Sequence, residues 1–228
     1  MHSTAMKNCG AFFECYAAGF RDSENVQVID IGSQDVNGSL MQVTPREFSY
    51  PGLDFQEAKN VDILLDDPYK LPLDDESVDI VLSSSCFEHS ELFWLTFLEI
   101  QRVLKPSGLF YFNVPSAGSF HRYPVDCWRF YPDSGHALVT WSRRNGYETV
   151  LLESFTQIGG RWQDCVSVFL KQEGQVGQFP NRILDRKADI ENAYQYGQDK
   201  LKNQKKLCQN DRKLEAIGSI SAEKVWIQ

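Results

Sequence analysis

Short apolar runs separated by turns rich in Gly, Pro and Asp recur along the first half of the chain. The runs contain many Val and Ile residues, which is typical of strands buried on both faces. We predict five such strands, at residues 26–31, 48–55, 61–65, 78–83 and 109–114. Two closing strands are expected at residues 149–155 and 164–170, as an antiparallel pair at the sheet edge.

Helical spacing of apolar residues appears between and beyond these runs. It predicts helices at residues 5–20, 92–104 and 134–145, and a long polar helix at 183–215 with a thin apolar stripe. A helix that begins near Ser39 is expected to end early at Pro45. Residues 116–133 have no helical period and are interpreted as an ordered functional loop.

Strands that alternate with helical segments indicate an α/β fold, with a mostly parallel seven-stranded sheet and helices on both faces. Right-handed crossovers place the loop after each parallel strand at one edge of the sheet. The strand ends near Gly32, Asp54, Asp67, Ser85 and Pro115 are therefore expected to meet in one crevice. We assign residues 1–173 to this domain and residues 174–228 to a linker and a C-terminal helical extension.

Composition narrows the class of protein. The net charge of −8 disfavours nucleic-acid binding. The six cysteines have no C-x-x-C spacing, which favours reduced thiols over a disulfide framework or a zinc site. Neither a secretory leader nor an apolar run of about 18 residues is found, so we expect a soluble cytoplasmic protein without membrane contact.

The turn after the first strand has the residues of a nucleoside-binding site. Gly32 has no Cβ, so a ligand can approach the main chain, and a following helix can offer free N–H groups to an anion. Asp54 follows Asp30 at close to the ~20-residue spacing at which an acid binds a ribose diol. A purely structural glycine turn and a surface acid are the alternatives.

Four segments, in order, carry a family resemblance. Residues 28–33 resemble motif I of the class I S-adenosylmethionine-dependent methyltransferases, and residues 67–81 resemble that family's third and fourth strands. Residues 83–89 and 99–109 are similar to the segment after the fourth strand and to the next helix and turn. The nearest similarity is to small members that act on sugars and other small molecules.

The resemblance implies a Rossmann-like methyltransferase fold and S-adenosyl-L-methionine as cofactor. Gly32 and Ser33 would line its methionine part, and Asp30 would anchor the amine directly or through water. Gln34 stands where the family usually has a second glycine, so the loop is expected to bend differently.

The same resemblance assigns the rest of the cofactor site. Asp54 would bind the ribose hydroxyls, and Phe55 would flank the adenine. The remaining positions are Asp67 and Pro68 at the adenine edge, and Ser84 and Ser85 beneath the sulfonium. The pair Glu88-His89 is interpreted as a helix cap that shapes the pocket.

The loop after the fifth strand is predicted to bind the methyl acceptor. His121 is the candidate catalytic base, because a histidine can remove a proton from a hydroxyl near neutral pH. Acceptor contacts are assigned to Tyr123, Asp126, Trp128 and Arg129. The alternative is a packed connector in which Trp128 is core and Asp126 pairs with Arg129.

These features predict an O-methyltransferase whose acceptor is a hydroxyl of a sugar, nucleotide-sugar or glycan, with no metal. The Asn/Asp-Pro-Pro-Tyr run of amino-directed nucleic-acid methyltransferases is absent from the sequence. A homodimer through the C-terminal helix is a further expectation. The alternatives are a non-catalytic cofactor-binding module and an NAD-dependent oxidoreductase, whose G-x-G-x-x-G motif is broken by residues 33–35.

Overall fold

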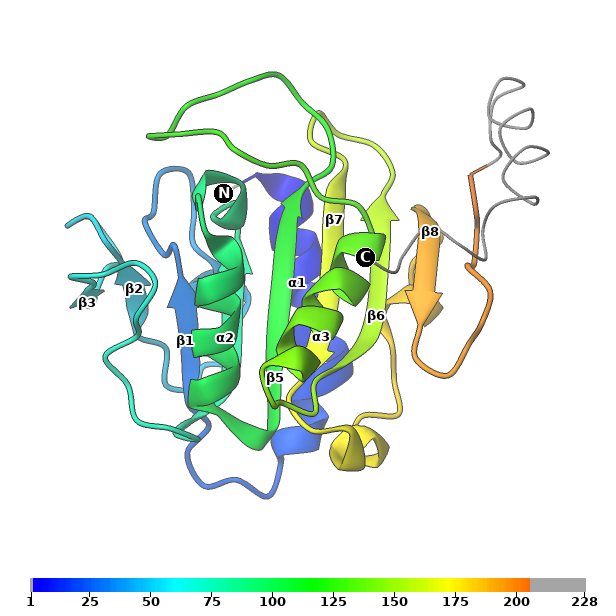
Figure 1. Cartoon of the computed structure of the whole chain (residues 1–228), viewed down its shortest axis with the longest axis horizontal. Coiled ribbons are helices and arrows are strands. Elements are labelled where there is room, and N and C mark those ends of the chain that lie inside the picture. The colour runs from blue at the N-terminus through cyan, green and yellow to red at the C-terminus, as the bar shows by residue number, and fades with distance from the viewer. Residues whose placement is uncertain (1, 206–228) are drawn as a thin grey trace.

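A computed structural model of the chain describes residues 2–205. Its centre is one eight-stranded sheet with the order β3-β2-β1-β4-β5-β7-β6-β8 (Figure 1). The strands are β1 (Val28–Ile31), β2 (Gly52–Asp54), β3 (Ile63–Leu64), β4 (Val78–Ser84), β5 (Leu104–Pro115), β6 (Val150–Gln157), β7 (Asp164–Leu170) and β8 (Ile190–Gln195). Strands β1 to β5 pair in parallel, whereas β7 is antiparallel to β5 and β6. The mostly parallel α/β sheet predicted from the sequence is confirmed.

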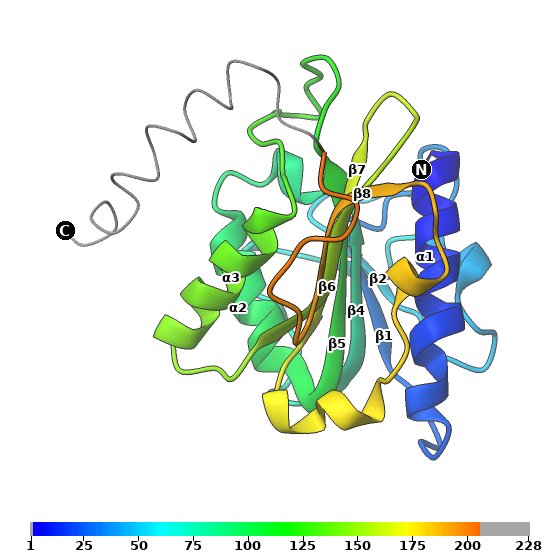
Figure 2. The ribbon, with the colours of Figure 1, turned by 90° about the vertical axis from the view of Figure 1, so that its right-hand side faces the viewer.

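Helices cover both faces of the sheet, as expected. Helix α1 (Ser3–Tyr16) packs on one face, and α2 (Phe93–Val103) and α3 (Asp133–Arg144) pack on the other (Figure 2). Each face has its own apolar cluster, one built around Phe12 and Tyr111 and the other around Phe97 and Phe110. Strands β4, β6 and β7 are buried along their whole length, and short apolar runs at residues 80–82, 150–152 and 168–170 lie within them.

The helix expected after β1 is reduced to one turn. Residues Leu40–Val43 form a 3₁₀ turn, and Thr44 is already extended because Pro45 follows. The Ser39 hydroxyl accepts a hydrogen bond from Met41 N (3.1 Å) and caps this turn. Gly32 is therefore not followed by the predicted helix N-terminus, and residues 33–39 between Gly32 and the 3₁₀ turn are irregular.

The predicted helix at 183–215 is wrong over its described part. Residues Ile183–Asp185 form a 3₁₀ turn, and β8 adds an eighth strand, antiparallel to β6. Asn192 has a φ of 52° at a bulge, where the register between β6 and β8 shifts by one residue. The bulge turns both Ile190 and Ala193 toward one core cluster, whereas Tyr194, which was predicted to share an apolar stripe with Ile190, packs against the cluster on the other face. Residues 206–215 of the prediction lie outside the described residues, and the homodimer expected through this helix stays a prediction.

A buried carboxylate attaches the segment before β8 to the sheet. Glu153 of β6 accepts hydrogen bonds from the Tyr16 hydroxyl (2.5 Å) and from the backbone N–H groups of Ile183 (2.9 Å) and Leu184 (3.0 Å). Burial raises the pKa of this carboxyl, and its three donors oppose that rise.

We expect Glu153→Ala to lower the free energy of unfolding by about 3 kcal/mol, because it leaves three buried donors without an acceptor. Urea denaturation measures the change. Glu153→Gln keeps one carbonyl acceptor and the side-chain volume, so its loss should be about half as large. Equal losses for the two variants would contradict the assigned role.

Two findings bear on the compositional expectations. Within residues 2–205, no helix combines the length and the apolar character needed to cross a membrane. The five described cysteines are free thiols: three are buried (Cys9, Cys15 and Cys165), Cys86 is half-buried and Cys127 is exposed. Cys208 lies outside the described residues.

Candidate active site

The carboxyl ends of the parallel strands meet in one cavity of about 800 Å³. Its wall includes Gly32 after β1, Asp54 of β2, Leu65 after β3, Ser85 after β4 and Pro115 of β5. The loop 116–132 arches over this end of the sheet (Figure 1). The predicted convergence on one crevice is confirmed, with the neighbouring Pro68 in place of Asp67.

Gly32 forms the tight turn at the floor of the cavity. Its φ is +78°, and a Cβ at this position would lie 2.6 Å from both Cβ and Sγ of Cys86. Its backbone N–H donates to the Leu53 carbonyl (2.9 Å), which fixes the turn against β2. Ser33 is buried behind the turn, where its hydroxyl donates to the Asn60 carbonyl (2.9 Å). A glycine is therefore required at position 32 by the left-handed φ and by the lack of room for a Cβ. Ser33 stabilises the turn and does not line the cavity.

We expect Gly32→Ala to lower the free energy of unfolding by about 2–4 kcal/mol, since a left-handed alanine and an overpacked contact add their costs. Gly146 is the matched control, because its φ of +89° is similar and a Cβ there would meet nothing within 4 Å. Gly146→Ala should cost only about 1–2 kcal/mol. Equal losses in urea denaturation would show that the contact with Cys86 does not matter.

Asp30 lies behind the cavity wall. Its carboxylate accepts a hydrogen bond from the Tyr50 hydroxyl, and its side chain is outside the cavity lining. Burial raises the pKa of Asp30 to about 7, and the hydrogen bond from Tyr50 opposes the rise. The structure thus brings Asp30 to Tyr50, on the side of the strand facing α1, and any contact with the cofactor amine would need an intermediary.

The end of β2 presents one carboxylate and one aromatic ring to the cavity, from Asp54 and Phe55. Asp54 is 8% exposed, and its Oδ1 accepts from the Gln56 backbone N–H (3.2 Å). Phe55 is 53% exposed and stands at the rim. A carboxylate beside an exposed ring fits a ribose diol next to a flat base.

Of the predicted adenine-edge pair, only Pro68 lines the cavity. Asp67 is exposed and caps its own turn by accepting from the Tyr69 backbone N–H (2.8 Å). Tyr69 is a wall residue that the sequence did not single out, although its position directly after Asp67-Pro68 would have justified it.

Ser84 and Ser85 both reach the cavity at the end of β4. The Ser84 hydroxyl accepts from Asn113 Nδ2 (3.2 Å), so a buried amide on β5 orients it. Ser85 has a φ of +53°, and its N–H donates to the Asn113 carbonyl (2.9 Å). A non-glycine residue held in the left-handed region is uncommon, and such conformations cluster at functional sites.

His121 also lines the cavity, from the loop after β5. Its backbone N–H donates to Asp126 Oδ2 (2.7 Å), and its ring Nδ1 lies 3.4 Å from the same oxygen. Its ring also packs against Trp162, with centroids 4.6 Å apart. Trp162 lines the cavity and comes from the β6–β7 loop, so two separate loops build this wall.

Among the four predicted acceptor residues, Tyr123 alone lines this cavity. Asp126 and Arg129 pair through two hydrogen bonds of 2.6 and 2.8 Å, and these hydrogen bonds lower the pKa of Asp126 to about 2. Trp128 packs against Phe93 and Trp94 in a separate aromatic cleft between α2 and α3. These three residues hold the loop in place, as the packed-connector alternative supposed, and none of them lines this cavity.

Glu88 and His89 are wall residues whose chemistry the sequence interpretation undervalued. They form part of the 3₁₀ turn Phe87–His89 that follows β4. Burial raises the pKa of Glu88 to about 8 and lowers that of His89. The His89 ring contacts the His121 ring edge to face, with centroids 4.9 Å apart. Only the fold brings this pair to His121, so no local spacing could have shown it.

Comparison with protein families gives a direct match to this region. Residues 12–112 match the family described as a methyltransferase domain. The chain carries a class I S-adenosylmethionine-dependent methyltransferase domain. The match contains β1 to β4 with their loops and most of β5, which supply much of the cavity wall. S-Adenosylmethionine is the cofactor of the methyltransferase domain, and Gly32, Asp54, Pro68, Ser84 and Ser85 fit it.

Solved structures support the fold of the methyltransferase domain. The chain is similar to 1,6-didemethyltoxoflavin-N1-methyltransferase from Burkholderia thailandensis, solved with S-adenosylhomocysteine, at 14% identity and a TM-score of 0.55, over 74% of this chain and 79% of that one. A putative sarcosine dimethylglycine methyltransferase from Galdieria sulphuraria matches at 14% identity and a TM-score of 0.55, over 75% and 86%. The [4+2]-cyclase SpnF matches at 14% identity and a TM-score of 0.52, over 74% of this chain and 82% of that one. Since a cyclase shares the fold, the acceptor chemistry must be argued from the cavity.

Curated protein sequences give no match to the chain.

Proposed function

We propose that the protein transfers a methyl group from S-adenosylmethionine to a hydroxyl of a small, carbohydrate-like acceptor. The observation that carries this proposal is the position of His121, a histidine on the cavity wall with a carboxylate behind it. A base at this wall suits an acceptor that must lose a proton on methylation, and a hydroxyl is such an acceptor.

The cofactor side of the cavity fits a nucleoside with a flexible polar tail. The Asp54 carboxylate is placed for the ribose hydroxyls, and Phe55 and Pro68 offer apolar contact to the adenine. Gly32 allows the tail to approach the main chain where any side chain would collide with Cys86. Ser84 and Ser85 then lie between the cofactor side and His121.

When bound, the cofactor supplies an electrophilic methyl group on a sulfonium. The protein's part is to align the acceptor oxygen with that methyl and to exclude water. The acceptor oxygen forms the new bond to the methyl carbon, the bond from that carbon to sulfur breaks, and its electron pair stays on sulfur as S-adenosylhomocysteine. The hydroxyl proton passes to the free ring nitrogen of His121, whose resulting positive charge Asp126 stabilises.

The acceptor class follows from the rest of the wall. Trp162 and Tyr123 provide broad aromatic surface, and Glu88 and His89 provide polar groups beside it. Apolar walls with a few convergent polar groups are the usual build of a small-molecule site. The net charge of −8 opposes a polyanionic acceptor such as a nucleic acid.

The test is a transfer assay with radiolabelled S-adenosylmethionine over a panel of sugars, nucleotide-sugars, phenols and amines. We expect label in a hydroxyl-bearing carbohydrate product that resists base, as an ether does. Label found only in amine products would overturn the assignment of an oxygen acceptor while leaving the methyltransferase domain intact.

A further inference from the structure

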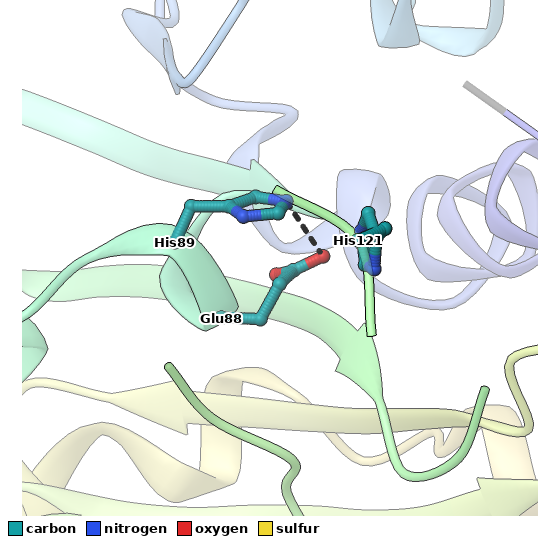
Figure 3. A group of neighbouring side chains, drawn as sticks. All are labelled: Glu88, His89 and His121. Atoms are coloured by element: carbon teal, nitrogen blue, oxygen red, sulfur yellow. Dashed lines mark ion pairs between the residues drawn. The ribbon is translucent and has the colours of Figure 1, made fainter. Parts of the chain in front are cut away.

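Three side chains on the cavity wall bring proton-accepting atoms to one point. Glu88, His89 and His121 each place one ligand atom so that all three atoms lie within 4.8 Å of one another (Figure 3). Two come from the turn after β4 and one from the loop after β5. Within residues 2–205, this is the one cluster of His, Cys, Asp or Glu side chains with such spacing.

Glu88 is the buried member of this cluster. It is 1% exposed, and its Oε1 lies 3.8 Å from His89 Nε2 (Figure 3). Its Oε2 is buried and has no hydrogen-bond partner among the described residues. A buried carboxyl oxygen without a hydrogen-bond partner is costly, so Oε2 leaves this carboxyl with an unused position for a ligand.

The histidines are oriented to offer lone pairs. His89 Nδ1 donates to the Val125 carbonyl, which leaves Nε2 free on the side of Glu88. His121 Nδ1 faces two acceptors, the Ser119 carbonyl (3.3 Å) and Asp126 (3.4 Å), which favours a proton there and a lone pair on Nε2. Arg129 also reaches His121 Nδ1 at 3.5 Å, but Asp126 neutralises its charge. Histidines that bind metals are held in this way, with the second nitrogen donating to a carbonyl or carboxylate.

We propose that Glu88, His89 and His121 bind a divalent transition-metal ion, with its remaining coordination positions open to the cavity. Two imidazoles and one carboxylate are a donor set that zinc accepts. Bonds of about 2.0–2.2 Å hold tetrahedral zinc ligands roughly 3.3–3.6 Å apart, whereas the three atoms here are separated by up to 4.8 Å, so binding requires a contraction of up to about 1.5 Å. His121 lies on a loop and can supply that movement.

Occupancy of the site has a defined consequence for the proposed function. The metal takes the lone pair of His121 that would receive the acceptor proton, so metal binding and base catalysis exclude each other. Zn²⁺ is therefore a reversible inhibitor. This consequence rests on the proposed function, whereas metal binding itself does not.

The test is a calorimetric titration of Zn²⁺ into chelator-treated full-length protein, without cofactor or acceptor. We expect one saturable site in the wild type, and a loss of affinity of about 100-fold or more in His89→Ala and His121→Ala. His136→Ala is the matched control, because His136 lies on α3 outside the cluster, and should bind like the wild type. Circular dichroism verifies that each variant is folded.

Either of two results would overturn the metal site: no saturable Zn²⁺ binding by the wild type, or unchanged affinity in folded His89→Ala and His121→Ala. A turnover assay separates this from the proposed function. Turnover that falls with Zn²⁺ and recovers on chelation supports both. Turnover that rises with Zn²⁺ keeps the metal site and overturns the role of His121 as base.

Discussion

Replacing His121 by alanine is expected to lower turnover by about 10²-fold or more and to leave the Kd for S-adenosylmethionine unchanged. The loss follows from removing a general base, which contributes about 10²–10⁴-fold to proton-transfer steps. The Kd is spared because His121 lies on the loop after β5, whereas Asp54 and Phe55 lie at the end of β2, three positions away in the sheet order. Steady-state kinetics in chelated buffer, together with calorimetric titration of the cofactor, measure both quantities.

The control for this variant is His136→Ala, since His136 is a histidine on α3 that does not line the cavity. It should keep wild-type turnover. Wild-type turnover in His121→Ala would show that His121 is not the general base and that it is only a loop residue held by Asp126. A weakened cofactor Kd in His121→Ala would instead mean that the two walls are not independent.

Asp54→Ala is expected to weaken S-adenosylmethionine binding by about 10- to 100-fold. Hydrogen bonds to a charged group contribute about 1.5–3 kcal/mol, and each 1.4 kcal/mol is a factor of ten in Kd. The carboxylate is nearly buried and faces the cavity, so solvent replaces its contacts poorly. Calorimetric titration of the cofactor measures the change.

Asp67→Ala is the matched control for Asp54→Ala. Asp67 is an acid at the same end of the sheet, but it is exposed and caps its own turn. Its removal should leave the Kd within about twofold, since surface substitutions of this kind change free energies by less than about 0.5 kcal/mol. Equal Kd values for Asp54→Ala and the wild type would show that the ribose does not bind at Asp54.

The sheet and its convergent edge could be predicted from the sequence because their signals are local. The predicted strands are rich in apolar residues, and turn residues such as Gly32 or Pro115 mark where they end. The right-handed crossover rule then assembles these ends without knowledge of any long-range contact. The cofactor side of the cavity follows from those two regularities together with the motif resemblance.

The errors arose where contacts distant in the sequence decide the outcome. Ile190 and Tyr194 are spaced in the sequence as on one face of a helix, and only the pairing with β6, with its bulge at Asn192, shows that the segment is a strand. In the loop over β5, Trp128 and Arg129 were indistinguishable from acceptor residues until the neighbours on α2 and at Asp126 were known.

The role of Glu88 and His89 could not be predicted from the sequence either, because it depends on a contact between distant segments. In the sequence they look like a helix cap, and their relation to His121 exists only because the turn after β4 faces the loop after β5. A functional cluster assembled from two loops leaves no spacing signal in either. The resemblance motifs, which end with β5, could not supply it.

The most direct test of the central claim is a crystal structure of the protein with S-adenosylhomocysteine bound. We predict the ligand in the cavity at the carboxyl ends of β1, β2 and β4, with its ribose hydroxyls on Asp54 and its sulfur between Ser85 and His121. Failure to bind at millimolar ligand, or a ligand whose sulfur points away from the His121 wall, would contradict the account.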